Sequence, residues 1–168
     1  MAFKRTLKRM DTFNEGQSYL GTVATVTLPK LARKFEEWRG GGMDRPVKID
    51  LGGEALEMEF ALGGPELGVL RQYGAVGVAA VYLRFVGAYQ DDRTGAVDSY
   101  EVTVRGRHEE IDMGEAKVGE SGEFKVKSAL AYYRLDVNGV TEIEIDVLAD
   151  TFIVGGVDRN AELRAAIS

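Results

Sequence analysis

The sequence predicts a mainly β fold, and three observations lead to this prediction. Apolar and polar residues alternate in several short runs, as they do in strands that have one buried and one solvated face. Asn138 and Gly139 stand between two such runs, and this dipeptide is typical of a tight hairpin turn. Glycine is frequent at 21 residues and proline is rare at 3, which fits many turns between strands.

Alternation predicts the individual strands. The expected strands are residues 47–51, 56–62, 100–105 and 143–147, and residues 22–28 are also strand-prone because they are rich in Val and Thr. Residues 124–137 form a longer run, and the Asn-Gly turn after it predicts a hairpin with residues 140–147. Polar segments at residues 90–98 and 112–122 are expected to be exposed connections. A β-sandwich or barrel core follows from this pattern.

Two helices are also expected, one internal and one at the C-terminal end. Pro65 suits the first turn of a helix and Gly74 suits a left-handed stop, which predicts a helix over residues 65–73. Asp158 suits the N-cap of the second helix, and Gly155-Gly156 before it predicts a tight turn into that helix. The expected apolar faces consist of Leu67, Leu70 and Tyr73 in the first helix and of Leu163, Ala166 and Ile167 in the second.

The segment from residue 28 to residue 52 is the most informative part of the chain. It holds three consecutive glycines between amphipathic stretches, and this pattern is typical of a hairpin arm with a shaped tip that touches another protein. Leu31, Phe35 and Trp38 nevertheless follow the i, i+4, i+7 spacing of a helix, and the glycines after them suit a helix stop. The strand-prone residues before this stretch argue for a strand. Periodicity alone leaves both structures open and slightly favours the helix.

Composition indicates an ordinary globular protein of one domain, residues 1–168. The formal net charge of −6 argues against static, tight binding to nucleic acid, which needs many basic side chains. The chain has no cysteine, which excludes disulfides and thiolate metal sites. The N-terminal stretch lacks the apolar core of a signal peptide, and no apolar run is long enough to span a bilayer. We therefore expect a cytosolic protein without membrane insertion, unless it leaves by a route that needs no signal.

Histidine and glycine offer no convincing active site. His108 is the only histidine, and its charged neighbours favour a solvated position at the end of a strand over a catalytic role. Gly40, Gly41 and Gly42 lack the Gly-Lys-Ser/Thr ending of a phosphate-binding loop.

Paired carboxylates are the remaining candidates for chemistry. Glu57 and Glu59, and likewise Glu144 and Asp146, have the spacing of two acids on one face of a strand, as a glycosidase needs. A sugar-binding cleft usually carries several aromatic residues, however, and the chain has one tryptophan, so a solvated acidic face is favoured. We expect a protein that binds or builds something, with no catalytic residue, metal or cofactor.

An ordered set of residues then resembles a known family. The set consists of Leu28–Leu31 (LPKL), Lys34, Glu36 or Glu37, Gly41–Met43, Asp44 and Pro46; Asp50, Gly52, Glu54, Leu56 and Glu57; Ser128, Tyr132, Tyr133, Leu135, Val137 and Gly139; and Gly155, Val157 and Asp158. This set resembles the major tail tube protein of contractile-tailed phages, and it is similar to the tube subunits of R-type pyocins. The resemblance covers nearly the whole chain but is loose over residues 77–123.

The resemblance implies a fold and a task. The fold is a β-sandwich or barrel-like tail tube fold with a long β-hairpin arm, in which residues 30–38 and 47–51 are the limbs. The resemblance thus decides for strand over helix. Subunits of this family form hexameric rings that stack into the hollow inner tube of a virion tail. Expected partners are other copies of the chain, the tail sheath, baseplate and tail terminator proteins, and phage DNA that passes through the lumen. Assembly is expected in the host cytoplasm.

Two physical arguments agree with this assignment. Acidic balance suits a conduit along which DNA slides without sticking. Closure of strands into a ring removes exposed strand edges.

The expected contacts between subunits or rings lie at the arm tip: Gly40, Gly41, Gly42, Met43, Asp44, Arg45 and Pro46. Candidates for the lumen or for a subunit junction are Glu57, Glu59, Glu144 and Asp146.

Two alternatives remain open at this stage. The tube of a DNA-less tailocin uses the same kind of subunit, so the sequence does not separate it from a phage tube. A small carbohydrate-binding or hydrolytic β-sandwich belongs to a different class, and it predicts a monomer with an aromatic cleft.

Overall fold

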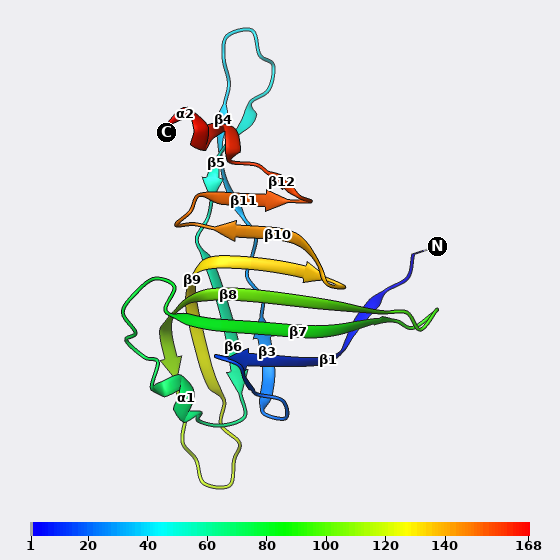
Figure 1. Cartoon of the computed structure of the whole chain (residues 1–168), viewed down its shortest axis with the longest axis vertical. Coiled ribbons are helices and arrows are strands. Elements are labelled where there is room, and N and C mark those ends of the chain that lie inside the picture. Colours follow the sequence, from blue (N-terminus) through cyan, green and yellow to red (C-terminus); the bar gives the residue numbers. More distant parts are fainter. Residues whose placement is uncertain (1) are drawn as a thin grey trace.

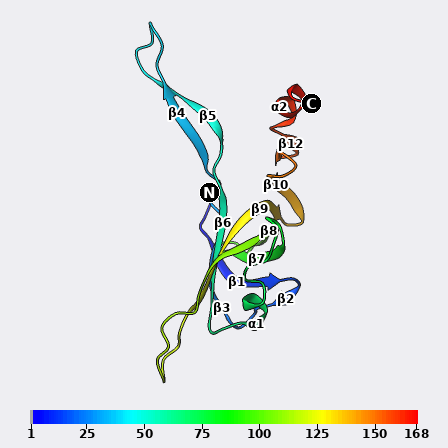
Figure 2. The same ribbon diagram turned by 90° about the vertical axis from the view of Figure 1, so that its left-hand side faces the viewer.

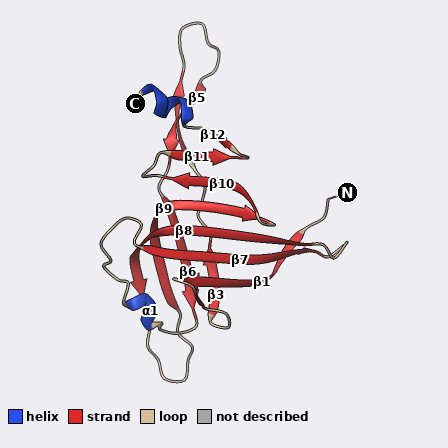
Figure 3. Cartoon of the chain, in the orientation of Figure 1, coloured by secondary structure: helices blue, strands red, loops and turns tan. Residues whose placement is uncertain are grey.

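The computed structural model describes residues 2–168 and consists mainly of antiparallel strands (Figures 1 and 3). This confirms the predicted fold class. The elements are β1 (Arg5–Asn14), β2 (Gln17–Ser18), β3 (Val23–Thr27), β4 (Arg33–Trp38), β5 (Val47–Gly53), β6 (Leu56–Leu62), α1 (Leu67–Leu70), β7 (Val81–Asp91), β8 (Val97–Asp112), β9 (Phe124–Val137), β10 (Val140–Asp146), β11 (Thr151–Val154), β12 (Val157–Asp158) and α2 (Ala161–Ala166).

The main sheet bends around its two longest strands. Ten strands form it, and the principal order is β12-β11-β10-β9-β8-β7-β1-β2. The first half of β9 pairs with β6, which in turn pairs with β3, whereas the second half of β9 pairs with β10. Strand β8 follows β9 through both halves, with register shifts at Arg105/Gly106 and His108/Glu110. Such bulges increase local bending, so the β3–β6 layer can fold over the layer of β1, β7 and β8.

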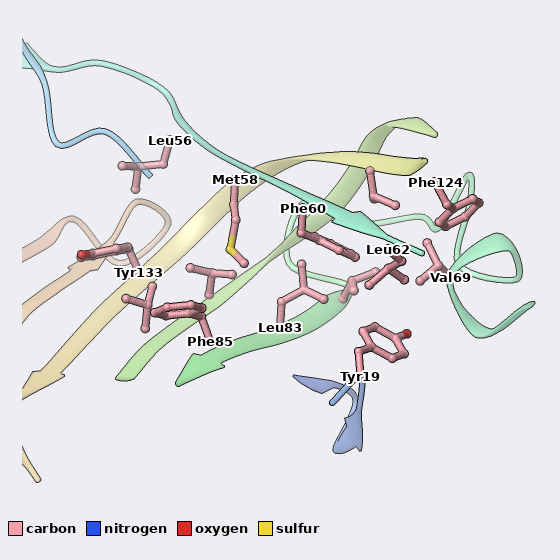
Figure 4. Close-up of a cluster of buried hydrophobic side chains, with 14 residues drawn as sticks. Tyr19, Leu56, Met58, Phe60, Leu62, Val69, Leu83, Phe85, Phe124 and Tyr133 are labelled. Carbon is pink, nitrogen blue, oxygen red and sulfur yellow. The ribbon is translucent and has the colours of Figure 1, made fainter. Parts of the chain in front are cut away.

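The hydrophobic core lies between these two layers (Figure 4). Strand β6 contributes Met58, Phe60 and Leu62, and β7 contributes Leu83 and Phe85; all five are almost fully buried. The alternating residues Glu57 and Glu59 on β6 are exposed, as period-2 alternation predicts for a half-buried strand.

A separate two-stranded sheet of β4 and β5 forms a long arm that extends away from the core (Figure 2). The arm confirms the hairpin that the resemblance implied, although β4 begins at Arg33 and not at Lys30. Strands β4 and β5 pair from Phe35↔Asp50 to Trp38↔Val47. The backbone groups of residues 35–38 thus form hydrogen bonds across the ribbon, whereas in a helix they would bond to residues of the same segment. In this strand Phe35 and Trp38 face opposite sides, so their helical spacing is coincidental.

The predicted internal helix is shorter than expected, and its buried face is only partly as predicted. Helix α1 covers Leu67–Leu70, so Pro65 precedes it, and the chain continues through turns to Gly74, whose φ of 78° is left-handed as predicted. Leu67 and Tyr73 are exposed and Val69 is buried, whereas Leu70 is half-buried and packs against the core as predicted. Only one helical turn forms, so the chain cannot present a continuous i, i+3, i+6 face.

The C-terminal segment also differs from its prediction. Gly155 and Gly156 have φ values of 59° and 84° and form the turn between β11 and β12, not a turn into a helix. Asp158 lies in β12, and Asn160 takes the N-cap position of α2. Asp158 instead accepts hydrogen bonds from the Asn160 amide and the Arg164 guanidinium. The predicted apolar residues Leu163 and Ile167 are exposed on this subunit.

The hairpin around Asn138 and Gly139 is confirmed. Both residues have positive φ values, 51° and 82°, which a type I′ turn requires. Strands β1, β7 and β11 were not predicted. Arg5–Asn14 and much of β7 alternate only weakly in polarity, and their outward faces carry apolar or long amphipathic side chains.

Candidate functional site

The arm carries an apolar face that nothing in the subunit covers. Cross-strand partners share a face, which places Trp38, Val47 and Ile49 on one side of the ribbon, followed by Leu51. Trp38 is 61% exposed, Val47 47% and Ile49 45%. The alternation in residues 47–51 is typical of a half-buried strand, but among the described residues β5 pairs only with β4, the other limb of the arm. An isolated two-stranded ribbon is marginal in water, so this face is suited to burial against another chain.

The arm tip is a compact loop between β4 and β5. The Met43 amide donates a hydrogen bond to the Gly40 carbonyl, and the Met43 Sδ accepts a hydrogen bond of 3.2 Å from the Gly40 amide. The Arg39 Nε donates to the Met43 carbonyl at 3.0 Å. Gly42 has a φ of 83°, which favours glycine, whereas neither Gly40 nor Gly41 has a positive φ. The tip residues lie together as predicted, but Met43 folds back over the loop and only one of the three glycines needs its conformational freedom.

The charged tip residues remain exposed. Arg45 and Asp44 approach one another at 3.9 Å, with side chains that are 91% and 99% exposed. A pair so exposed contributes little to the stability of the subunit. These charges are therefore free to meet charges on a second chain.

A groove of about 840 Å³ separates the base of the arm from β9, β10, β11 and α2. Arg33 spans it: its Nε donates to Asp50 at 2.5 Å, and its guanidinium lies over the Phe152 ring, 5.0 Å from the centroid. This hydrogen bond, together with one from the Gly52 amide, lowers the pKa of the Asp50 carboxyl. Arg33 thus ties the arm to the C-terminal strands and helps fix its direction.

The predicted carboxylates do not form one site. Glu57 and Glu59 lie on the exposed face of β6, where Lys127 is 3.6 Å from Glu57. Glu144 and Asp146 are half-buried on β10, which pairs with the other half of β9. Glu144 accepts a hydrogen bond from the Tyr132 hydroxyl, and Asp146 accepts hydrogen bonds from the backbone amides of Leu148 and Ala149. Asp146 therefore stabilises the turn into β11, a local role that its spacing from Glu144 did not indicate.

His108 is buried, and the prediction of a solvated position was wrong. His108 lies in β8, and its side chain points into the buried interior of the subunit. The ring Nε2 is 2.8 Å from the Gln72 Oε1, and the Nδ1 is 2.9 Å from the Ser128 Oγ. Gln72 also exchanges two amide hydrogen bonds of 2.7 Å with Asn14. These uncharged contacts connect the turn after α1 to strands β1, β8 and β9, so His108 has a structural position.

Burial lowers the pKa of His108 from its ordinary value of 6.5 to about 4. The unfolded chain therefore binds more protons than the folded chain between these values, and stability is full above pH 6.5 and declines as the pH falls towards 4. Lowering the pH from 7 to 4.5 is expected to reduce the free energy of unfolding by on the order of 2 kcal/mol through this residue. Urea unfolding at several pH values measures the effect. The variant His108→Gln should lose this part of the pH dependence, and an unchanged slope would contradict the assignment.

The described residues, 2–168, contain no group of three or more His, Cys, Asp or Glu side chains arranged to hold a metal ion. In the same part of the chain, no helix is long and apolar enough to cross a membrane. The features that stand out are thus surfaces: an uncovered apolar arm, a charged tip and a groove at the arm base.

Comparisons with known proteins agree with a subunit that has exposed contact surfaces. The family model of phage tail tube protein FII matches residues 4–167. The chain belongs to this tail tube family. It is 46% identical over 170 residues to the tail tube protein of Escherichia phage P2, with 99% of both chains covered. It is 37% identical over 150 residues to the major tail tube protein of Serratia phage KSP20, with 88% of this chain and 86% of that protein covered.

Solved structures of low sequence identity share the fold of this tail tube protein. One is the sheath/tube terminator of the PVC extracellular contractile injection system in its extended state, with a TM-score of 0.59 at 7% identity. That match covers 80% of this chain and 98% of the terminator chain. Another is a chain from the baseplate of the anti-feeding prophage, with a TM-score of 0.50 at 12% identity over 83% and 99% of the two chains.

Family membership confirms the resemblance that the sequence motifs indicated. The chain is a structural tail tube protein, a component of virions, and stacked hexameric rings are consistent with its family. The alternative of a carbohydrate-binding or hydrolytic sandwich is replaced by this finding. Trp38, the aromatic residue best suited to stack on a sugar, lies on the arm and lines neither the groove at the arm base nor the cavity near Tyr82 and Tyr132.

Proposed function

We propose that the chain forms hexameric rings whose arms hold each copy to its neighbours, and that the rings stack into a hollow tube. The observation that carries this proposal is the uncovered apolar face of the arm. Fully burying a side chain such as Val or Ile contributes about 1.5–3 kcal/mol, so Trp38, Val47 and Ile49 together supply a large driving force for association. A second copy is the proposed occupant because the chain belongs to the tail tube family, with which stacked hexameric rings are consistent.

Open strand edges support the same proposal. Strand β1 pairs with β7 on one side, but its other side meets only the two residues of β2, which face Phe13 and Asn14. At the opposite end of the sheet, β12 is two residues long. Exposed edges are prone to pair with another chain, and a closed ring removes them. Contacts of this head-to-tail kind close into a ring when the rotation between copies allows it.

The lumen of this tube is proposed to conduct phage DNA during genome ejection. Net negative charge supports this role because it limits retention of the phosphate backbone. The exposed Glu57 and Glu59 are candidates for a lumen or junction surface. Glu144 and Asp146 are engaged in local contacts within the subunit, which makes them weaker candidates. Both named relatives are phage proteins, which favours a phage tube over a DNA-less tailocin. Capsid and terminase genes beside this one would test that preference.

Partners at the ends and outside of the tube complete the proposal. The structural neighbours are a sheath/tube terminator and a baseplate chain, which supports contacts of this subunit with sheath, terminator and baseplate proteins in a contractile tail. Assembly is proposed to take place in the host cytoplasm, as the family resemblance implies.

The predicted contact at residues 40–46 is tested by two substitutions at the arm tip. An added Cβ at Gly41 meets no atom within 4 Å, and its φ is not positive, so Gly41→Val should fold normally. Met43→Asp places a carboxylate on the tip. Both variants are expected to remain monomeric, or to form rings that do not stack, at concentrations where the unmodified chain forms tubes. Size-exclusion chromatography with light scattering measures this, and unchanged polymerisation of both variants would remove the tip from the interface.

A further inference from the structure

Two segments extend beyond the body of the subunit at opposite ends of its long axis. The arm tip, residues 39–46, projects past the β12 edge of the sheet, and the loop of residues 113–123, between β8 and β9, projects past the β1 edge (Figure 1). Both segments lie on the same side of the sheet (Figure 2). A head-to-tail contact between these two edges would bring the arm tip of one copy towards the loop of the next.

The loop of residues 113–123 has a defined conformation, held by contacts within the loop. Gly114 has a φ of 74°, and a Cβ placed there would lie 2.6 Å from the Glu123 carbonyl oxygen, so the two ends of the loop approach closely. At the far end, the Glu120 amide donates to the Lys117 carbonyl and their side chains pair at 3.1 Å. Residues of this loop are exposed in the subunit, and Val118 shows no burial at all.

Charge on the two segments is complementary. The loop carries three carboxylates, Glu115, Glu120 and Glu123, against one lysine, Lys117. Within the subunit, Glu120 pairs with Lys117 and Glu123 pairs with Lys125, just beyond the loop. The arm tip carries two arginines, Arg39 and Arg45, against one aspartate, Asp44. Glu115 forms no ion pair among the described residues, and the only carboxylate near Arg45 is its neighbour Asp44. Opposite charges at a contact favour correct register and suppress wrong pairings.

Apolar side chains accompany these charges on both segments. Met113 and Val118 are exposed on the loop, and Trp38 is exposed at the end of β4 where the tip begins. Isolated exposed apolar residues are ordinary, but here they stand among complementary charges at the two ends that would meet. Burial of a side chain such as Val118 against Trp38 would add hydrophobic free energy to the electrostatic attraction.

We propose that the loop of residues 113–123 is the receptor for the arm tip of a second copy of this chain. The inference rests on the proposed assembly into rings and tubes, and it names the surface that the arm contacts. Arg39 and Arg45 face the carboxylates of the loop, and Val118 packs against the apolar side of the tip.

Cross-linking tests this contact directly because the chain has no cysteine of its own. The double variant Asp44→Cys/Val118→Cys places one thiol on each segment, at positions that are among the most exposed in the subunit. Under assembly conditions, a short bifunctional maleimide should link copies into a ladder of covalent oligomers on a denaturing gel. The two segments lie at opposite ends of one subunit, so a link within one copy does not compete (Figure 1).

Matched variants give the test its controls. Each single variant should yield no covalent dimer, because a head-to-tail contact never brings two copies of the same position together. Asp44→Cys combined with Thr94→Cys, in the exposed turn between β7 and β8, should also fail to form the ladder. Charge reversal gives an independent measurement: Arg45→Glu should raise the concentration needed for assembly about tenfold, and Glu115→Arg in the same chain should restore it.

The outcomes separate this inference from the proposed function. Tubes that form without any cross-linked ladder, and without a response to charge reversal, would overturn the loop as receptor while leaving the tube intact. A chain that never assembles under any condition would overturn the proposed function itself. A ladder in the double variant alone, with rescue of Arg45→Glu by Glu115→Arg, is the result we expect.

Discussion

Replacing Ile49 with aspartate is expected to leave the subunit folded and to abolish its assembly into rings and tubes. Ile49 lies on β5, away from the hydrophobic core, and is 45% exposed, so the subunit loses little by the change. In the assembly, the substitution removes a large apolar side chain that would be buried between two copies. It also places a carboxylate in a contact from which water is excluded. The combined cost is about 3 kcal/mol or more per contact, which raises the required concentration more than 100-fold.

Lys48→Gln is the matched control for Ile49→Asp. Lys48 is the adjacent residue of the same strand and faces the opposite side of the ribbon, opposite Glu37. This variant should assemble at nearly the concentration of the unmodified chain, since it alters only an exposed charge. Circular dichroism verifies that both variants are folded, and sedimentation velocity measures assembly. Tubes formed equally well by Ile49→Asp would show that the apolar face is not buried between copies.

Gly106→Val is expected to destabilise the folded subunit strongly. Gly106 lies at the bulge where β8 shifts register against β9, and a Cβ built on it would lie 2.0 Å from the Ala129 carbonyl oxygen. This neighbour is backbone in the centre of the sheet, so it cannot move aside as a flexible side chain would. The expected loss is about 3 kcal/mol or more of unfolding free energy, at the upper end for overpacked sites.

Urea denaturation measures the loss, and Gly41→Ala serves as its control. A Cβ at Gly41 meets nothing within 4 Å, so the same kind of change there should shift the midpoint very little. Gly106→Ala should already destabilise the chain, because the first added carbon makes the clash. A midpoint for Gly106→Val equal to that of the unmodified chain would mean that β8 and β9 do not approach as closely as the structure shows.

Much of the fold is predictable from local chemistry. Alternation places Met58 and Phe60 in the core and Glu57 and Glu59 outside it, since one face of β6 is buried. The Asn138-Gly139 turn is also a local property, because it needs only two residues that tolerate positive φ. Strand β1 escaped prediction because its weak alternation reflects an edge position, which sequence pattern alone does not define.

The candidate site is harder to predict because it depends on distant pairing. The apolar residues Val47 and Ile49 alternate exactly as core residues do, and only the three-dimensional arrangement shows that no core lies behind them. His108 reads as solvated among charged neighbours, yet the covering layer and Gln72 from a distant segment bury it. Periodicity favoured a helix over residues 31–38, and the family resemblance was needed to choose the strand that the structure confirms.

Electron microscopy of the purified, unmodified chain at high concentration is the most direct test of the central claim. We expect hollow rings with sixfold symmetry that stack into tubes of uniform diameter, with density for the arm bridging neighbouring copies. A chain that remains monomeric at every concentration and salt condition, with its arm free in solution, would contradict it.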